Sequence, residues 1–176
     1  MSTINFPVTL KCKPVVWQYL INNYGEKLEL KKNDWILMLM VSLLQRDSAH
    51  KDSEITLQYY TKEVKLSITL EQYDRFGDQL SKTAMRTLNN RIEDVIHQQL
   101  YQFLEFYVHV AKYQLNPAIE MFQQLYNFPP EVYTHAAIKK YYQRDIQPHL
   151  VPQKFVGLNV PIKKKKKYNS IKYPKI

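Results

Sequence analysis

The sequence predicts an α+β protein that is mostly helical, and three observations lead to this class. Hydrophobic residues make up 45% of the chain, segments typical of strands occur before residue 70, and apolar residues recur at helical spacing after it. A chain of 176 residues is long enough to bury one core. We therefore expect a small α+β domain at 1–70, a helical region at 71–150 and an extended basic tail at 151–176.

The N-terminal domain is expected to hold two helices and about three strands. Rough alternation predicts a strand in INFPVTLKC, and β-branched and aromatic residues predict two more in ITLQYY and EVKLSITL. Pro14 opens a first helix that Gly25 ends, and Asn33 is expected to cap a second helix over DWILMLMVSLLQR. Because two strands alone are marginally stable, we expect all three to pair and to pack on the helices.

A long helix is predicted from Ser81 to about residue 113. Before it, Thr69 and Gln72 have the spacing of a capping box for a short helix, which Gly77 interrupts. A helix of that length reaches roughly 50 Å, more than a small domain needs. Either its apolar stripe packs on the chain's own domains, or it forms a homodimer seam through the 81–113 helix. The stripe consists of Met85, Leu88, Ile92, Val95, Ile96, Phe103, Tyr107 and Val110.

Residues 116–144 are predicted to form two helices around a proline-marked turn, supported by the end of the long helix. Asn116 is expected to cap the first helix, which buries Ile119, Phe122 and Leu125 or Tyr126, and Pro130 and Glu131 are expected in the first turn of the second. At about 100° per residue, the second helix turns Ala137, Ile138 and Tyr141 inwards. Its outer face then consists of His135, Lys139, Tyr142 and Gln143, flanked by Lys140 and Arg144. Lysine, arginine and glutamine contact phosphates and base edges, so this is a candidate DNA-recognition face.

Positive charge is concentrated at the C-terminal end. Residues 151–176 hold eight of the 25 Lys and Arg residues and no acid, so residues 1–150 hold 25 − 8 = 17 bases against 16 acids. Repulsion within the lysine run and the neighbouring prolines predict an extended segment that binds polyanions without reading sequence. A solubilising tail, nuclear import and contact with an anionic membrane surface are the other interpretations. The run consists of Lys163, Lys164, Lys165, Lys166 and Lys167.

Enzyme, cofactor and metal signatures are absent from the sequence. Cys12 is the only thiol, the five histidines lack ligand spacing, and three glycines leave no phosphate-binding loop. His97 and Tyr101 share a helical face, but a tyrosine nucleophile on a phosphodiester would need clustered cations, and only Arg91 is near. Apolar runs are too short to span a bilayer. We expect a non-enzymatic cytoplasmic protein with no cofactor, no metal, no small-molecule substrate and no membrane span.

The span from about Lys82 to Arg144 resembles a group of small, poorly characterised proteins from phages and mobile elements of Bacteroidetes-type bacteria, which carry a C-terminal helix-turn-helix. The stretches AIEMFQQLYNF and IKKYYQR carry the resemblance. It implies a DNA-associated protein in a bacterial host cell, in some cases virion-associated. We expect a non-enzymatic DNA-binding protein that uses the helix-turn-helix and the lysine-rich tail. The alternative is a structural or assembly protein of a phage particle or nucleoprotein complex, whose tail contacts nucleic acid.

Overall fold

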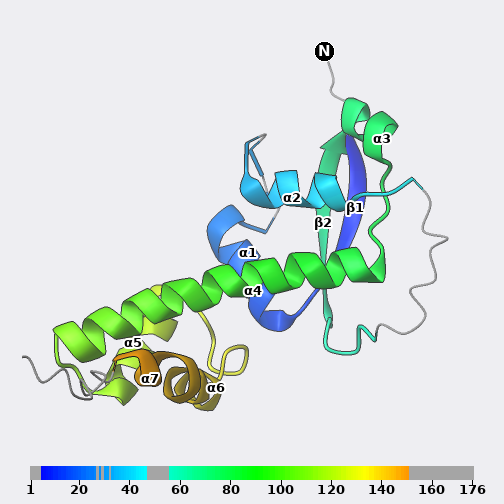
Figure 1. The fold of residues 1–176 in the computed structure, drawn as a ribbon. Coiled ribbons are helices and arrows are strands. Elements are labelled where there is room, and N and C mark those ends of the chain that lie inside the picture. The colour runs from blue at the N-terminus through cyan, green and yellow to red at the C-terminus, as the bar shows by residue number, and fades with distance from the viewer. Residues whose placement is uncertain (1–4, 27, 29, 32, 47–55, 151–176) are drawn as a thin grey trace, which may run out of the picture.

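The computed structural model describes residues 5–26, 28, 30–31, 33–46 and 56–150 (Figure 1). Its strands are β1 (Asn5–Cys12) and β2 (Lys62–Thr69). Its helices are α1 (Pro14–Tyr24), α2 (Trp35–Leu43), α3 (Leu70–Phe76), α4 (Lys82–Leu104), α5 (Leu115–Leu125), α6 (His135–Tyr141) and α7 (Gln147–Leu150), with two π-helical segments, η1 (Glu105–Val110) and η2 (Tyr142–Ile146). The predicted α+β, mostly helical class is confirmed.

In the described part of the chain, the sheet consists of two antiparallel strands, in a register that places Val8 opposite Leu66. Alternate residues of each strand are buried, because successive side chains point to opposite faces of a sheet. The predicted third strand is wrong as far as the described residues reach. Residues 56–60 of ITLQYY are turn and irregular structure, and the Tyr60 N–H donates to the Leu57 carbonyl at 3.0 Å. That local hydrogen bond closes a turn, so strand propensity alone does not extend this backbone.

The first two helices lie beside the sheet and begin close to the predicted positions. Pro14 lies in the first turn of α1 and Gly25 ends it, as predicted. The cap of α2 is Asp34 and not Asn33: the Asp34 carboxylate accepts a hydrogen bond from the Ile36 N–H at 2.9 Å. The same carboxylate accepts from the Tyr24 hydroxyl at 3.2 Å, so it also connects the end of α1 to the start of α2. Burial, followed by this carboxylate, raises the pKa of Tyr24.

The caps of α3 and α4 are those predicted. Thr69 and Gln72 form a complete capping box, and the Ser81 hydroxyl accepts from the Ala84 N–H at 3.1 Å. Gly77 ends α3 with a φ of 87°. A Cβ there would overlap the backbone of Gln45, so only glycine fits this close approach.

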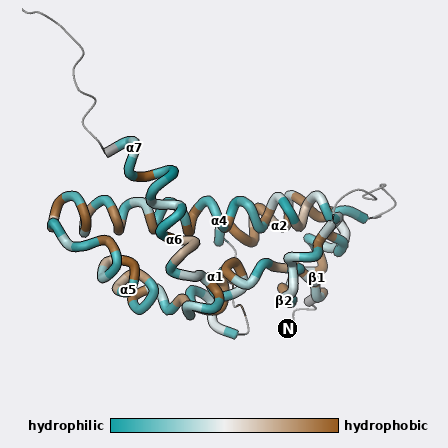
Figure 2. The backbone as a smooth tube through the Cα atoms, turned by 90° about the horizontal axis from the view of Figure 1, so that it is seen from below, coloured by the Kyte–Doolittle hydropathy of each residue, from teal (hydrophilic) through white to brown (hydrophobic). Residues whose placement is uncertain are grey.

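α4 extends along most of the length of the molecule (Figure 1). It packs on β1, α1 and α2 along its first part and on α5 and η2 along its second. In Figure 2, brown and teal alternate along the α4 tube, as expected of a helix with one apolar side. Leu88, Ile92 and Ile96 are fully buried inside the chain. This part of the stripe is therefore packed on the chain's own core and is not open to a second chain.

The helix ends differently from its prediction. It continues to Val110 as η1 and stops at Ala111, rather than running as α-helix to residue 113. Lys112 then takes a φ of 61°, which turns the chain towards α5. Val110, the last residue of the predicted stripe, is 65% exposed. The two ends of the stripe thus have different environments.

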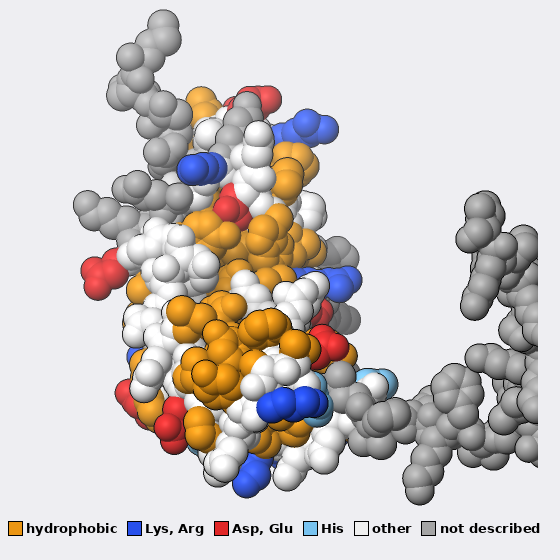
Figure 3. All heavy atoms as spheres, turned by 90° about the vertical axis from the view of Figure 1, so that its left-hand side faces the viewer, with side chains coloured by type: hydrophobic (Ala, Val, Ile, Leu, Met, Phe, Trp, Pro, Cys, Tyr) orange, Lys and Arg blue, Asp and Glu red, His pale blue; other side chains and the backbone are white. Residues whose placement is uncertain are grey.

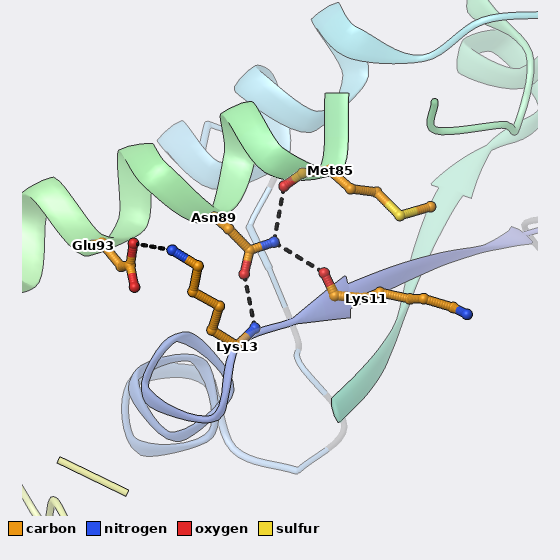
Figure 4. Close-up of polar contacts among 5 residues, drawn as sticks. All are labelled: Lys11, Lys13, Met85, Asn89 and Glu93. Atoms are coloured by element: carbon orange, nitrogen blue, oxygen red, sulfur yellow. Dashed lines mark hydrogen bonds and ion pairs between the residues drawn. The ribbon is translucent and has the colours of Figure 1, made fainter. Parts of the chain in front are cut away.

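A buried amide joins α4 to the junction between β1 and α1 (Figure 4). The Asn89 Nδ2 donates to the carbonyls of Lys11 and Met85 at 2.9 and 2.8 Å, and its Oδ1 accepts from the Lys13 N–H at 3.0 Å. One turn further, the Lys13 ammonium lies 2.6 Å from the Glu93 carboxylate. These contacts fix where α4 crosses the sheet, because the amide and the ion pair both connect the helix to the end of β1.

The buried apolar residues form one cluster that includes residues from Val8 in β1 to Ile146 in η2. The cluster passes through α4, so both sides of the predicted boundary at residue 70 contribute to it. Whether 1–70 and 71–150 fold as separate units stays a prediction.

Candidate nucleic-acid interface

α5 forms the first helix of the predicted pair. It begins at Leu115 with Gln114 at the cap position, so Asn116, the predicted cap, lies inside the first turn next to Pro117. Ile119 and Phe122 are fully buried as predicted, and Tyr126 is half-buried against the ring of Phe122. Leu125 is 69% exposed, so Tyr126 and not Leu125 completes the buried side.

The connection between the two helices is long and well packed. α5 ends at Leu125 and α6 begins at His135, which leaves nine residues, whereas helix-turn-helix units use three or four. Phe128 and Tyr133 are buried, and the Gln123 Nε2 donates to the Tyr133 carbonyl at 2.6 Å. From α1, the Asn22 amide donates to the carbonyls of Tyr126 and Asn127, which ties the connection to the N-terminal part of the chain.

α6 begins later than its prediction. Residues 130–132 form a turn, in which the Val132 and Tyr133 N–H groups donate to the Pro129 carbonyl, so Pro130 and Glu131 do not belong to the helix. The cap is Thr134, whose hydroxyl accepts from the Ala137 N–H at 3.2 Å. The sequence signal for this start is Thr134 itself, because threonine is a preferred N-cap residue.

The buried side of α6 is rotated from the predicted one. Ile138 is fully buried and Tyr141 is half-buried, as predicted, but Ala137 is exposed and Tyr142, predicted outside, is buried. The buried residues Ile138, Tyr142 and Ile146 are spaced by four, because the helix widens into the π-helical η2 at Tyr142. Projection at about 100° per residue assumes a regular α-helix, so it misplaced the stripe by part of a turn.

The outer side of α6 and η2 keeps most of the predicted interface residues. Lys139, Lys140, Gln143 and Arg144 are exposed, and His135 is half-buried. Ala136 and Ala137 are exposed in the first turn, so the N-terminal end of this face is small and allows close approach of a ligand. The side chains of Lys139, Lys140 and Gln143 form no hydrogen bond or ion pair with any residue that the structure describes.

Arg144 differs from the two lysines because a neighbouring carboxylate neutralises it. Its guanidinium donates to both carboxylate oxygens of Asp145, with Nη2 2.6 Å and Nε 2.8 and 3.0 Å from them. Hydrogen bonding to Arg144 lowers the pKa of Asp145, so the pair stays charged. Arg144 is therefore a weaker candidate for a phosphate contact than Lys139 or Lys140.

Two histidines, one in α4 and one in η1, hold α6 and η2 against these two segments. The His97 ring from α4 stacks on Tyr141 with centroids 4.4 Å apart, and the His109 Nε2 from η1 lies 2.7 Å from the Tyr142 hydroxyl. In Figure 1, α6 and α7 lie below the second part of α4. Burial lowers the pKa of His97, which favours the neutral ring at this contact. His97 thus contacts Tyr141, and its hypothetical pairing with Tyr101 has no hydrogen bond among the described contacts.

The second half of the predicted interface lies outside the described residues. Lys163 to Lys167 belong to 151–176, so their position relative to α6 is not part of the structure. Within the described ranges, no three His, Cys, Asp or Glu side chains gather into a potential metal site. Burial raises the pKa of the Cys12 thiol to about 12.

Comparison of the chain with models of protein families, with curated proteins and with solved structures finds no match. The resemblance to phage and mobile-element proteins therefore stays a prediction. None of the helices in the described part of the chain is both long and apolar enough to cross a bilayer.

Proposed function

We propose that this chain is a non-enzymatic DNA-binding protein whose α5, connection and α6 form a helix-turn-helix-like unit, with α6 facing the DNA. In this proposal Lys139, Lys140 and Gln143 contact the nucleic acid, and Lys163 to Lys167 add phosphate contacts. The protein acts in a bacterial host cell and is encoded by a phage or mobile element.

One observation carries the proposal: the outer side of α6 is exposed, and its lysines are unpaired within the described residues. Had another segment packed on this side, α6 would be an ordinary core helix. Instead, Ile138 of α6 is buried on one side together with Tyr142 and Ile146 of η2. The opposite side of α6 and η2 offers two ammonium groups, an amide and two alanines. This combination suits a helix that approaches a groove, where ammonium groups contact phosphates and amides contact base edges.

Two observations favour the alternative, a structural or assembly protein. The nine-residue connection is longer than that of a helix-turn-helix, and the Arg144–Asp145 ion pair removes one cation from the face. A packed helical hairpin with a few surface lysines would have the same two features. The basic residues of 151–176 would then contact packaged nucleic acid or an acidic partner.

Selection from random duplex DNA, followed by fluorescence anisotropy on the enriched and random duplexes, tests the proposal. If Gln143 or Lys139 reads a base edge, its change to alanine costs about 1 to 3 kcal/mol of binding on the enriched duplex and much less on random DNA. Lys65→Ala is the matched control, since Lys65 is an exposed lysine on β2, away from α6.

Each result separates the two functions. Equal losses of affinity for both duplexes from Lys139→Ala and Lys140→Ala would mean that α6 contacts phosphates and does not read bases. Unchanged binding in the alanine variants of Lys139, Lys140 and Gln143, with Lys65→Ala also unchanged, would contradict the proposal and favour the assembly protein. His135→Ala and Arg144→Ala complete the set and are expected to have smaller effects, because His135 is half-buried and Arg144 is paired.

A further inference from the structure

An apolar surface lies where the long helix ends. Phe106 and Val110 of η1 and Tyr113 just beyond it are 53%, 65% and 50% exposed, and we call these three residues the terminal apolar patch. Figure 3 shows hydrophobic side chains gathered on this end of the molecule, with acidic and basic side chains at their edge. Contiguous exposed apolar surface of this kind marks interaction sites in proteins that are otherwise well packed.

The rings of the patch are held in place from below. Tyr107 contacts Phe106, Tyr113 and the buried Phe103, with ring centroids 5.3, 5.7 and 4.3 Å apart. The Tyr113 N–H also donates to the Tyr107 carbonyl at 2.8 Å. Because these rings are already ordered, covering them would cost little conformational entropy. The patch is thus a preformed surface.

The charges beside the patch indicate what covers it. Glu105 begins η1 and Lys112 follows it, so along the chain an acid precedes Phe106 and a base follows Val110. Neither side chain forms an ion pair with another residue in the described part of the chain. If two η1 segments pack antiparallel about a two-fold axis, Glu105 of each copy faces Lys112 of the other. A parallel arrangement would bring like charges together.

We propose that the terminal apolar patch is the docking site for a second copy of this chain, with the two η1 segments antiparallel. This places the dimer contact at residues 105–113 and not along the buried stripe around Ile92. Covering three half-exposed side chains removes on the order of 300 Å² per copy. Since stable dimers bury about 1,200 Å² or more in total, this dimer is weak and depends on concentration.

The dimer does not require DNA binding, although it deepens the proposed function. A two-fold pair presents two α6 helices, and helix-turn-helix dimers read two half-sites in this way. Because association is measured without nucleic acid, its failure and the failure of DNA binding are separate results.

Sedimentation velocity of the full chain, from low to high micromolar concentration, tests the contact. The wild type is expected to shift from monomer towards dimer, and Val110→Glu to weaken association at least about tenfold. Met38→Glu is the matched control, because Met38 is 55% exposed on α2 and lies outside the patch. A monomeric wild type at the highest concentration, or equal weakening by Met38→Glu, would overturn the proposal.

A charge exchange tests the antiparallel arrangement. Glu105→Lys and Lys112→Glu should each weaken association, and the double variant should restore it, because the reciprocal pairs re-form with opposite polarity. Circular dichroism measures whether each variant is folded. If Val110→Glu unfolds, the charge-exchange variants decide the result instead. A double variant no better than the single ones contradicts the antiparallel contact.

Discussion

The imidazole of His97 in α4 stacks on the phenol ring of Tyr141 in α6, with the ring planes 15° apart. The next tyrosine, Tyr142, makes the second contact of this kind through its hydroxyl with His109. Both contacts join the candidate interface to α4 and η1. The packing of α6 on α4 therefore includes a titratable ring, that of His97.

Stability should fall as the pH drops below the ordinary pKa of histidine. Burial lowers the pKa of His97, and this outweighs the opposite effect of Glu93, Asp94 and Asp145, with Arg144 acting in the same direction as burial. The unfolded chain then binds more protons than the folded one, so the free energy of unfolding is highest above about pH 6.5 and declines as the pH falls towards the folded pKa. Urea titrations at several pH values measure this decline.

The variant His97→Phe keeps a ring for stacking and removes the titration. Its unfolding free energy should depend less on pH than that of the wild type across the same range. The exposed His149 supplies the control, because His149→Gln should keep the wild-type dependence. If His97→Phe follows the wild-type curve, this contact does not govern the pH dependence.

Removal of the side-chain amide of Asn89 should lower the free energy of unfolding by a large amount for so small a group. Asn89→Ala removes the acceptor for the Lys13 N–H and the donor for the Lys11 carbonyl, and both groups lie at the end of β1 where α4 covers them. Leaving them unpaired costs about 1 to 3 kcal/mol of unfolding free energy. Asn90→Ala, at the exposed neighbouring position, should change it by less than about 0.5 kcal/mol. Chemical denaturation of both variants compares them, and equal effects would refute the role of the buried amide.

Two glycines with similar backbones should respond differently to alanine. Gly25 and Gly77 have φ values of 74° and 87° with extended ψ values of 174° and −168°, a region that is essentially restricted to glycine, so either alanine is strained by about 1 to 3 kcal/mol. A Cβ at Gly25 meets open space, whereas one at Gly77 overlaps the backbone of Gln45 and Arg46. Gly77→Ala should therefore cost roughly 2 to 6 kcal/mol in total, since overpacking of about 1 to 3 kcal/mol adds to the strain. Thermal unfolding of the two variants gives the difference, and a smaller cost at Gly77 than at Gly25 would contradict the packing.

Local signals account for most of the fold that the sequence predicted. The capping box of Thr69 and Gln72, the Ser81 cap and the boundary residues Pro14 and Gly25 each depend on side chains within a few residues of the backbone groups they satisfy. The third strand failed because pairing depends on distant segments. Nothing in ITLQYY itself shows that, among the described residues, β1 pairs only with Lys62–Thr69.

The candidate interface was predictable in composition and not in orientation. The residues Lys139, Lys140 and Gln143 are exposed as the periodicity predicts. Tyr142 was misplaced because the π-helical segment and its contact with His109, 33 residues earlier, are tertiary features. The exposure of Val110 could not be predicted for the same reason. Val110 follows the periodicity of the buried residues, but the chain turns away at Lys112 before another element covers it.

Deleting residues 162–176 should flatten the salt dependence of binding to random duplex DNA. The deletion removes Lys163 to Lys167 with Lys172 and Lys175, and the slope of log K against log salt falls by about 0.9 for each phosphate that the shortened chain no longer neutralises. The apolar core of the described residues extends only to Ile146, so thermal unfolding should hardly change.

Deleting 168–176 is the matched control, because it shortens the chain and keeps the five-lysine run. Fluorescence anisotropy at several salt concentrations should show a large change in slope for the first deletion and a small one for the second. An identical slope in both deletions and the wild type would assign the phosphate contacts to the folded part of the chain, with Lys139 and Lys140 as the first residues to test.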